Sequence, residues 1–229
     1  MSHIQIAIDG PSGSGKSSLS RRVAAKMGIV YVDTGALYRT IGYYARGCGI
    51  SLAEIDKVVG VLDDIHIEVK FENGGQSVYL NGENLGDKIR ENEISMYASA
   101  VAKVPAVRAF LLDVQKDIAN TNSVIMDGRD IGTVILPNAD VKIFMSASIE
   151  ARARRRCAEL EEKGMPASYE EILSDIIARD KQDSEREIAP AVAAPDAIHF
   201  DNSERGFEES LEALIKLIED TLASKNISL

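Results

Sequence analysis

Short apolar runs alternate with longer amphipathic stretches along most of this 229-residue chain. The apolar runs lie at residues 3–8, 29–33, 123–127, 140–145 and 196–200. Because they lack the alternation of a half-exposed strand, they predict strands buried on both faces, as in a parallel sheet. Helical spacing of apolar residues occupies residues 16–27, 35–47, 92–119, 148–163, 168–186 and 206–224. This order predicts an α/β fold with a five-stranded parallel sheet and helices on both faces.

One interval departs from the alternation of strands and helices. Residues 64–82 are rich in strand-forming side chains, and Asn73, Gly74 and Gly75 separate two strand-like runs within it. A glycine-rich pair between two such runs is typical of a hairpin. We therefore expect a small antiparallel β insert over about residues 62–90.

Composition and charge limit the partners of the chain. Hydrophobic residues make up 45% of it, which suits one domain over residues 1–229 with a small insert. The formal charge is -10, from 26 basic and 36 acidic side chains, and such a field repels nucleic acid and anionic membrane. We expect small-molecule partners, no nucleic acid or membrane partner, and a monomer. Any phosphate site must then be a local gathering of cations.

The N-terminus and the cysteines predict a cytoplasmic location. The first ten residues carry no basic region and no long apolar region, and no apolar stretch approaches the roughly 18 residues that span a bilayer. Cys48 and Cys157 lie far apart and do not form a CxxC pair, so we expect two reduced thiols.

A phosphate-binding motif follows the first predicted strand. Residues 10–17, GPSGSGKS, fit GxxxxGK[ST] and precede a predicted helix, the context that makes this motif a P-loop. The glycines let backbone N–H groups surround phosphates, Lys16 supplies a mobile charge, and the Ser17 hydroxyl can ligate Mg²⁺. The motif indicates a nucleoside triphosphate without naming the reaction.

A P-loop occurs in GTPase switches, in motor or nucleic-acid ATPases and in small-molecule kinases. A GTPase should carry an NKxD motif, and the chain has none. A nucleic-acid ATPase should have an acidic pair after a strand and a basic surface, whereas here Asp127 is followed by Gly128 in an acidic chain. These observations favour a small-molecule kinase.

A second candidate site follows the second predicted strand, where α/β proteins place ligands. Asp33 could reach the metal through water, or it could simply cap the next helix. Arg39 lies one helical turn later and could meet an acceptor phosphate, or it could be an ordinary surface charge.

A third candidate site, residues 127–133, follows another predicted strand. Asp127 could hold metal-bound water, Arg129 could bind phosphate, and Asp130 could accept from a donor on a base or sugar. The alternative is a tight turn that its own carboxylates stabilise. The crowding of charges at the end of an apolar strand favours a site.

Two further groups of charges lie on predicted helices. The spacing of Arg179, Asp183 and Arg186 places them on one helix face, where they could bind a ligand or form exposed ion pairs. Residues 151–156 hold several arginines, which on composition alone are typical of a solvated surface.

The segments GPSGSGKS, DTGALYR and DGRDIGTVILPNADVKIF together resemble the bacterial cytidylate kinases of the nucleoside monophosphate kinase superfamily. The resemblance covers nearly the whole chain, including the β insert. It implies ATP phosphates on the loop Gly10, Pro11, Ser12, Gly13, Ser14, Gly15, Lys16, Ser17 and Ser18. It also implies an acceptor-binding region at residues 34–120 and a lid at residues 150–186.

The resemblance further implies roles for individual side chains. The acceptor phosphate would meet Arg39, Arg129 and Arg186, and the acceptor site would also include Thr34, Arg179 and Asp183. The cytosine edge would be read by Ser99, Arg108 and Asp130. The side chains expected to stabilise the transferred phosphate are Lys16, Arg129, Arg152, Arg155 and Arg156.

The expected activity is transfer of the γ-phosphoryl group of ATP to CMP or dCMP, with Mg²⁺, by direct in-line attack. The alternatives are a kinase of another small acceptor such as UMP and, more remotely, a P-loop ATPase switch. The chain departs from the family pattern at Thr34, where serine is common, at Ala178, where an acidic residue is frequent, and at Ala191, where leucine is usual. None of these departures removes a charged contact.

Overall fold

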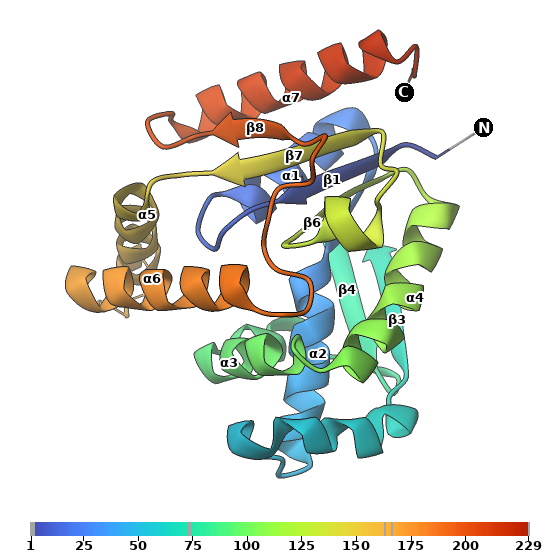
Figure 1. Cartoon of the computed structure of the whole chain (residues 1–229), viewed down its shortest axis with the longest axis vertical. Coiled ribbons are helices and arrows are strands. Elements are labelled where there is room, and N and C mark those ends of the chain that lie inside the picture. Colours follow the sequence, from blue (N-terminus) through green and yellow to red (C-terminus); the bar gives the residue numbers. More distant parts are fainter. Residues whose placement is uncertain (1–2, 73–74, 163, 166, 229) are drawn as a thin grey trace.

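The computed structural model describes residues 3–72, 75–162, 164–165 and 167–228. Five parallel strands form the central sheet in the order β2-β6-β1-β7-β8 (Figure 1). Their bounds are β1 Gln5–Asp9, β2 Val30–Asp33, β6 Val124–Gly128, β7 Val141–Ser146 and β8 Ile198–Asp201. Each strand lies at one of the predicted apolar runs, so the predicted α/β fold is confirmed.

Helices cover both faces of this sheet. The helices are α1 Lys16–Met27, α2 Thr34–Gly47, α3 Asn92–Val101, α4 Pro105–Thr121, α5 Ile149–Glu162, α6 Tyr169–Glu185 and α7 Phe207–Ser224. Ile6 and Ile8 of β1 pack in the apolar cluster that α1 and α7 share, whereas Ala7 packs in a cluster on the opposite face with residues of α4 and the short helix η3, Ile131–Ile135. Burial on both faces explains why the strands read as continuous apolar runs.

The prediction of one helix over residues 92–119 is wrong. The structure has two helices there, α3 and α4, and α4 begins at Pro105. A proline has no backbone N–H, and its ring clashes with the preceding helical turn, so it starts a helix more readily than it continues one. The break turns α4 by 96° from α3.

The antiparallel β insert is present within the predicted interval. Its strands are β3 Ile67–Glu72, β4 Gly75–Leu80 and β5 Glu83–Asn84. The predicted turn residues Asn73 and Gly74 lie outside the described residues. The ends of the interval are not strands, because 3₁₀ helices flank the sheet on both sides, η1 Leu52–Asp64 and η2 Gly86–Arg90. The pattern did not predict either helix.

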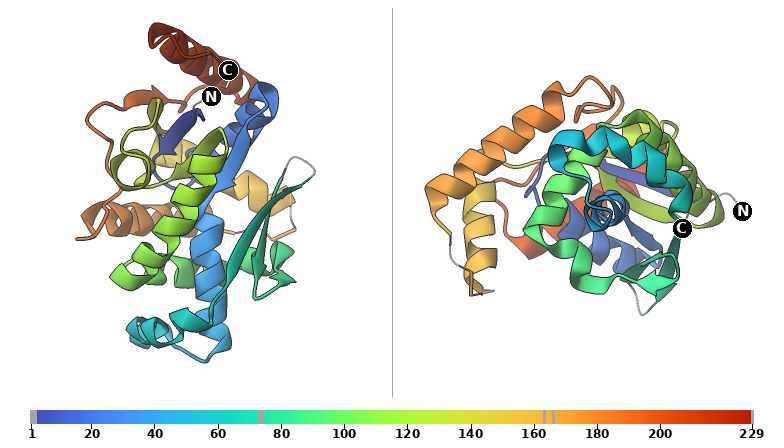
Figure 2. Two further views of the ribbon diagram at one scale, coloured as in Figure 1. Left: turned by 90° about the vertical axis from the view of Figure 1, so that its right-hand side faces the viewer. Right: turned by 90° about the horizontal axis from the view of Figure 1, so that it is seen from below.

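Two parts of the chain have apolar clusters separate from those of the central sheet. The first, which we call the α2 lobe, comprises residues 34–72 and 75–114 and surrounds α2 with α3, η1, β4 and the start of α4. Figure 2 shows this lobe below the sheet in its left view. The second is the pair α5 and α6, joined by a small cluster around Ala153 and Ile176.

Among the described residues, no single helix has the length and hydropathy needed to cross a membrane. A bent pair, Glu93–Val101 with Pro105–Thr121, reaches them only when both helices are taken together across a 96° bend.

Candidate active site

The P-loop connects β1 to α1 and lies against β7. Gly10 has φ 144°, and a Cβ at this position would lie 2.0 Å from the backbone oxygen of Met145. Only glycine fits so close an approach with this backbone conformation. Gly13 and Gly15 also have positive φ, so the loop backbone turns inward as the motif predicts.

Lys16 lies folded into the centre of the loop. Its Nζ donates to the Pro11 carbonyl oxygen at 2.7 Å and to Ser14 Oγ at 3.4 Å, and the residue is 5% exposed. Burial and the nearby Arg129 lower the pKa of Lys16 to about 7, against the opposite effect of Asp127 and Asp9. A phosphate anion in the loop would favour the charged lysine again.

A hydroxyl and a carboxylate meet beside the loop. Ser17 Oγ donates to Asp127 Oδ2 at 2.7 Å, and the Tyr31 hydroxyl donates to Asp127 Oδ1 at 3.0 Å. Burial, together with the charge of Asp33, raises the pKa of Asp127. Hydroxyl and carboxylate oxygens are ligands that Mg²⁺ accepts.

The described residues contain no group of three or more histidine, cysteine, aspartate or glutamate side chains that could hold a metal ion by themselves. A cation here would need further ligands. This suits Mg²⁺, which usually binds one or two protein groups together with water and substrate phosphates.

Asp33 caps α2 and pairs with Arg39. Asp33 Oδ1 accepts from the Ala36 N–H at 3.0 Å, and Asp33 Oδ2 accepts from Arg39 Nη2 at 2.7 Å. Thr34, the next residue, donates from Oγ1 to the Asp127 carbonyl oxygen at 2.8 Å. Both oxygens of Asp33 therefore have partners within the α2 lobe, and its predicted contact with a metal stays a prediction.

The turn after β6 gathers charges from three distant segments. Arg129 Nε donates to Asp183 Oδ2 of α6 at 2.8 Å. Asp130 is buried, accepts a hydrogen bond from Arg108 of α4, and lies 3.8 Å from Arg186 Nη2. The structure thus brings four of the predicted phosphate and base contacts together at this turn: Arg108, Arg129, Asp130 and Arg186.

Asp9 is a site residue that the pattern analysis missed. Its carboxylate accepts from the N–H groups of Ile131 and Gly132 at 2.7 and 2.8 Å, which holds the turn after β6 next to the P-loop. Burial raises the pKa of Asp9 to about 6. The sequence does contain a feature that indicates Asp9, namely an acidic residue at the end of a buried strand and directly before the first glycine of the P-loop motif.

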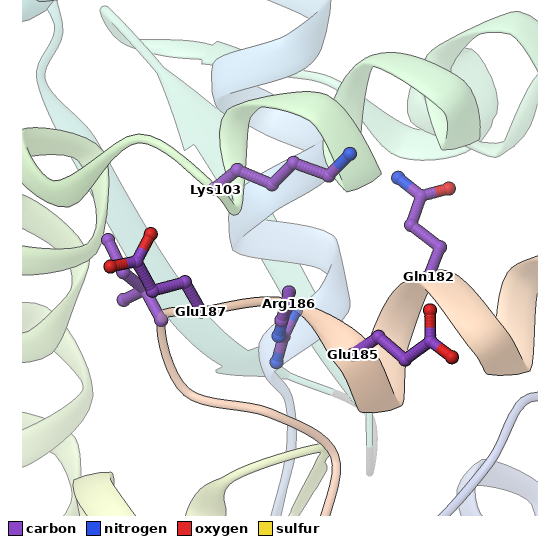
Figure 3. A pocket seen from close by; sticks show the side chains of 6 residues that line it. Lys103, Gln182, Glu185, Arg186 and Glu187 are labelled. Atoms are coloured by element: carbon purple, nitrogen blue, oxygen red, sulfur yellow. The ribbon is translucent and has the colours of Figure 1, made fainter.

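A cavity of about 390 Å³ opens between the α3–α4 junction and the end of α6. Lys103, Gln182, Glu185, Arg186, Glu187 and Ile188 line it (Figure 3). Gln182 Nε2 also donates to Ser99 Oγ of α3 at 3.2 Å, so the predicted base contact Ser99 lies at this side of the site.

The prediction that Arg186 shares a helix face with Arg179 and Asp183 is wrong. Helix α6 ends at Glu185, and Arg186 has ψ 140°, an extended conformation. Its Nε donates to the Ala189 carbonyl oxygen at 2.5 Å, which turns the chain away from the helix axis. Asp183 is buried in its pair with Arg129, whereas Arg179 is exposed.

The three predicted lid arginines have different surroundings. Arg152 is 2% exposed and donates from Nη1 to the Ser12 carbonyl oxygen of the P-loop at 3.0 Å. Arg155 Nη2 donates to the Asn202 carbonyl oxygen at 2.7 Å. Arg156 pairs with Glu159 on its own helix at 2.8 Å. Arg152 therefore lies at the P-loop, and Arg156 makes a local surface pair.

Asn202 is a second site residue that the pattern analysis missed. It follows β8, is 2% exposed, and donates from Nδ2 to the Ser14 carbonyl oxygen at 2.9 Å. Its own oxygens accept from Arg155, so it joins the P-loop to α5. No motif indicates this contact, because it depends on β8 lying beside β7.

Known proteins are similar to this chain along almost its whole length. Residues 6–220 match the family model described as cytidylate kinase. A cytidylate kinase from Fervidobacterium nodosum is 47% identical over 218 residues, 95% of this chain and 97% of that relative. A cytidylate kinase from Caldicellulosiruptor saccharolyticus is 46% identical over 217 residues, 95% of this chain and 96% of that relative.

A solved structure of an uncharacterized protein from Eubacterium ventriosum has a similar fold. It is 14% identical with a TM-score of 0.50, over 97% of this chain and 99% of that one.

Proposed function

Because the chain belongs to the cytidylate kinase family, we propose that it transfers the γ-phosphoryl group of ATP to CMP or dCMP, giving ADP and CDP or dCDP. The observation that carries the proposal at the site is Asp130, a buried carboxylate beside Arg108 and Arg186. A carboxylate accepts from the amino group of cytosine, and an arginine donates to its carbonyl. Uracil has a carbonyl in place of the amino group, which costs about 1–3 kcal/mol against a carboxylate.

The acceptor phosphate binds to Arg39, Arg129 and Arg186 in this proposal. In the present structure Arg39 and Arg129 are paired with Asp33 and Asp183. Arg39 uses Nη2 for Asp33 and Arg129 uses Nε for Asp183, so other N–H donors of each guanidinium can meet a phosphate oxygen while the pair holds its position. Thr34 and Arg179 complete the acceptor site.

Mg²⁺ fits the hydroxyl of Ser17 and the carboxylate of Asp127, which lie 2.7 Å apart beside the P-loop. When bound there, it would neutralise negative charge on the nucleotide phosphates. Tyr31 donates to the other oxygen of Asp127 and orients the carboxylate toward Ser17.

Transfer needs alignment and charge stabilisation more than covalent help. An oxygen of the acceptor phosphate attacks the γ-phosphorus in line, and the bond from phosphorus to the β,γ-bridging oxygen breaks, so that ADP leaves. Lys16, Arg129, Arg152 and Arg155 stabilise the charge on the moving group in this proposal, and the loop Gly10 to Ser18 holds the triphosphate. Movement of α5 and α6 as a lid would exclude water, which competes for the phosphoryl group.

A coupled assay of ADP formation with ATP and a panel of nucleoside monophosphates tests the proposal. We expect turnover with CMP and dCMP, weak turnover with UMP, and no activity without Mg²⁺. Selective turnover of UMP would contradict the cytidylate assignment, and ATP hydrolysis that needs no acceptor would favour an ATPase.

Three further properties stay predictions within this proposal. They are the division into an acceptor-binding region and a lid, a monomeric state, and a cytoplasmic location. Light scattering after size-exclusion chromatography measures the mass, and cell fractionation measures the location.

A further inference from the structure

The side-chain amide of Gln76 binds the backbone of Asp33 at two points. Gln76 Oε1 accepts from the Asp33 N–H at 2.7 Å, and Gln76 Nε2 donates to the Asp33 carbonyl oxygen at 3.2 Å. Gln76 lies on β4 of the β insert, and Asp33 is the last residue of β2 in the central sheet. This contact therefore joins the β insert to the central sheet.

The position of β2 in the sheet explains why the backbone N–H and carbonyl of Asp33 can bind a side chain. β2 is an edge strand, with only β6 beside it. The Val30 N–H donates to the Ser123 carbonyl oxygen toward β6, so by alternation the backbone groups of Asp33 face the open edge. A carboxamide has a donor and an acceptor in one plane, as a neighbouring peptide group would.

The conformation of Asp33 in turn controls Arg39. The two oxygens of Asp33 hold the first turn of α2 and the guanidinium of Arg39. A Cβ at Gly35 would lie 3.1 Å from both Arg39 Nη1 and Asp33 Oδ1, which shows how closely these groups pack. Phe71 of β3 packs against the apolar cluster that includes Val32 of β2, so the insert is also held at this cluster.

We propose that Gln76 is a positioning residue for the acceptor site, which fixes the backbone of Asp33 and thereby the orientation of Arg39 toward the acceptor phosphate. This inference rests on the proposed function. It gives the β insert a part in phosphate recognition that does not require any insert residue to touch the substrate.

The test compares Gln76→Ala with Asn81→Gly in steady-state kinetics and thermal unfolding. Asn81 is the matched control, because its amide also binds backbone at two points, His66 N–H at 2.8 Å and the Asp64 carbonyl oxygen at 3.0 Å, within the insert and away from β2. Glycine suits the φ of 50° at this position. Gln76→Ala should raise the KM for CMP about tenfold, the size expected from two lost hydrogen bonds, with the KM for ATP within about twofold.

Asn81→Gly should lower the unfolding temperature without raising the KM for CMP. Gln76→Glu keeps the acceptor but turns a carboxylate oxygen toward the Asp33 carbonyl oxygen, so it should raise the KM for CMP at least as much as Gln76→Ala. Because Gln76 acts through Arg39 in this inference, its effect should largely disappear when Arg39 is absent. In an Arg39→Ala background, Gln76→Ala should raise the dissociation constant for CMP, measured by calorimetry, by less than about twofold.

If the wild-type protein phosphorylates CMP, either of two results would overturn this inference and leave the proposed function standing. One is an unchanged KM for CMP in both Gln76 variants, and the other is an equal rise in Asn81→Gly. Should Gln76→Ala fail to fold, an unchanged KM in Gln76→Glu has the same meaning. Failure of the wild-type protein to phosphorylate CMP would instead overturn the proposed function, and this inference with it.

Discussion

Arg152 donates hydrogen bonds to both carboxylate oxygens of Asp180, from Nη1 to Oδ1 at 3.0 Å and from Nη2 to Oδ2 at 2.5 Å. The pair joins α5 to α6, and Arg152 also donates to the Ser12 carbonyl oxygen of the P-loop. Two parallel hydrogen bonds of this kind fix both position and orientation. The Arg152 guanidinium is thus held beside the P-loop.

The first prediction separates the lid arginines. Arg152→Ala should lower kcat on the order of 10³-fold, because it removes a desolvated cation beside the P-loop. Arg156→Ala should change kcat by less than about threefold, since its pair with Glu159 is a surface pair within one helix. Steady-state kinetics at saturating ATP and CMP measures both, and a larger loss in Arg156→Ala would contradict this assignment.

The second prediction concerns the P-loop lysine. Lys16→Ala should abolish measurable turnover, by about 10³-fold or more, while circular dichroism and the unfolding temperature stay close to those of the wild type. Lys26→Ala is the control, because Lys26 lies exposed in the last turn of the same helix. Near wild-type activity in Lys16→Ala would show that the phosphate site is elsewhere.

The third prediction separates the two aspartates that were expected at the metal. Asp127→Asn should raise the Mg²⁺ concentration for half-maximal rate by about tenfold or more, because it removes the negative charge of the carboxylate that would hold Mg²⁺ beside Ser17 in the proposed function. Asp33→Asn should instead raise the KM for CMP, because Asp33 holds Arg39 and caps α2. Titration of the rate with Mg²⁺ distinguishes them, and equal shifts would assign the metal to both.

The fourth prediction concerns the choice between cytosine and uracil. Asp130→Asn introduces an amide donor that can face the uracil carbonyl, so the ratio of kcat/KM for CMP to that for UMP should fall by about tenfold or more. Asp113→Asn, an exposed change on α4, serves as the control for loss of one negative charge. An unchanged ratio in Asp130→Asn would mean that the base is read by other groups.

The fifth prediction follows from the raised pKa of Asp9. The pKa of about 6 in the folded state exceeds the ordinary 3.8, so between these values the folded protein binds more protons than the unfolded chain. Its contribution to stability is therefore present at low pH and is lost as the pH rises through 6. Relative to Asp9→Asn, the wild type should lose roughly 1 kcal/mol of unfolding free energy between about pH 5 and pH 7.5.

Urea unfolding of the wild type and Asp9→Asn at both pH values measures this difference. A constant difference would mean that Asp9 titrates near its ordinary pKa in the folded protein.

Local patterns predicted the elements well and their ends less well. The five strands follow from burial on both faces, which leaves a continuous apolar run in the chain. The one helix predicted over residues 92–119 is two helices, because the restriction at Pro105 outweighs an apolar periodicity that continues across it. The prediction that Arg186 lies on a helix fails for a similar reason, since helical spacing does not show where the helix ends.

The sequence by itself determined the P-loop, the parallel α/β fold and the β insert, because each depends on residues that are neighbours in the chain. Only the tertiary structure decided which charges meet: Asp9 with the turn after β6, Arg129 with Asp183, Asn202 with Ser14 and Gln76 with Asp33. These partners are distant in sequence. They come together because the strand order β2-β6-β1-β7-β8 and the packing of the insert and of α6 bring their ends to one region, which no local periodicity encodes.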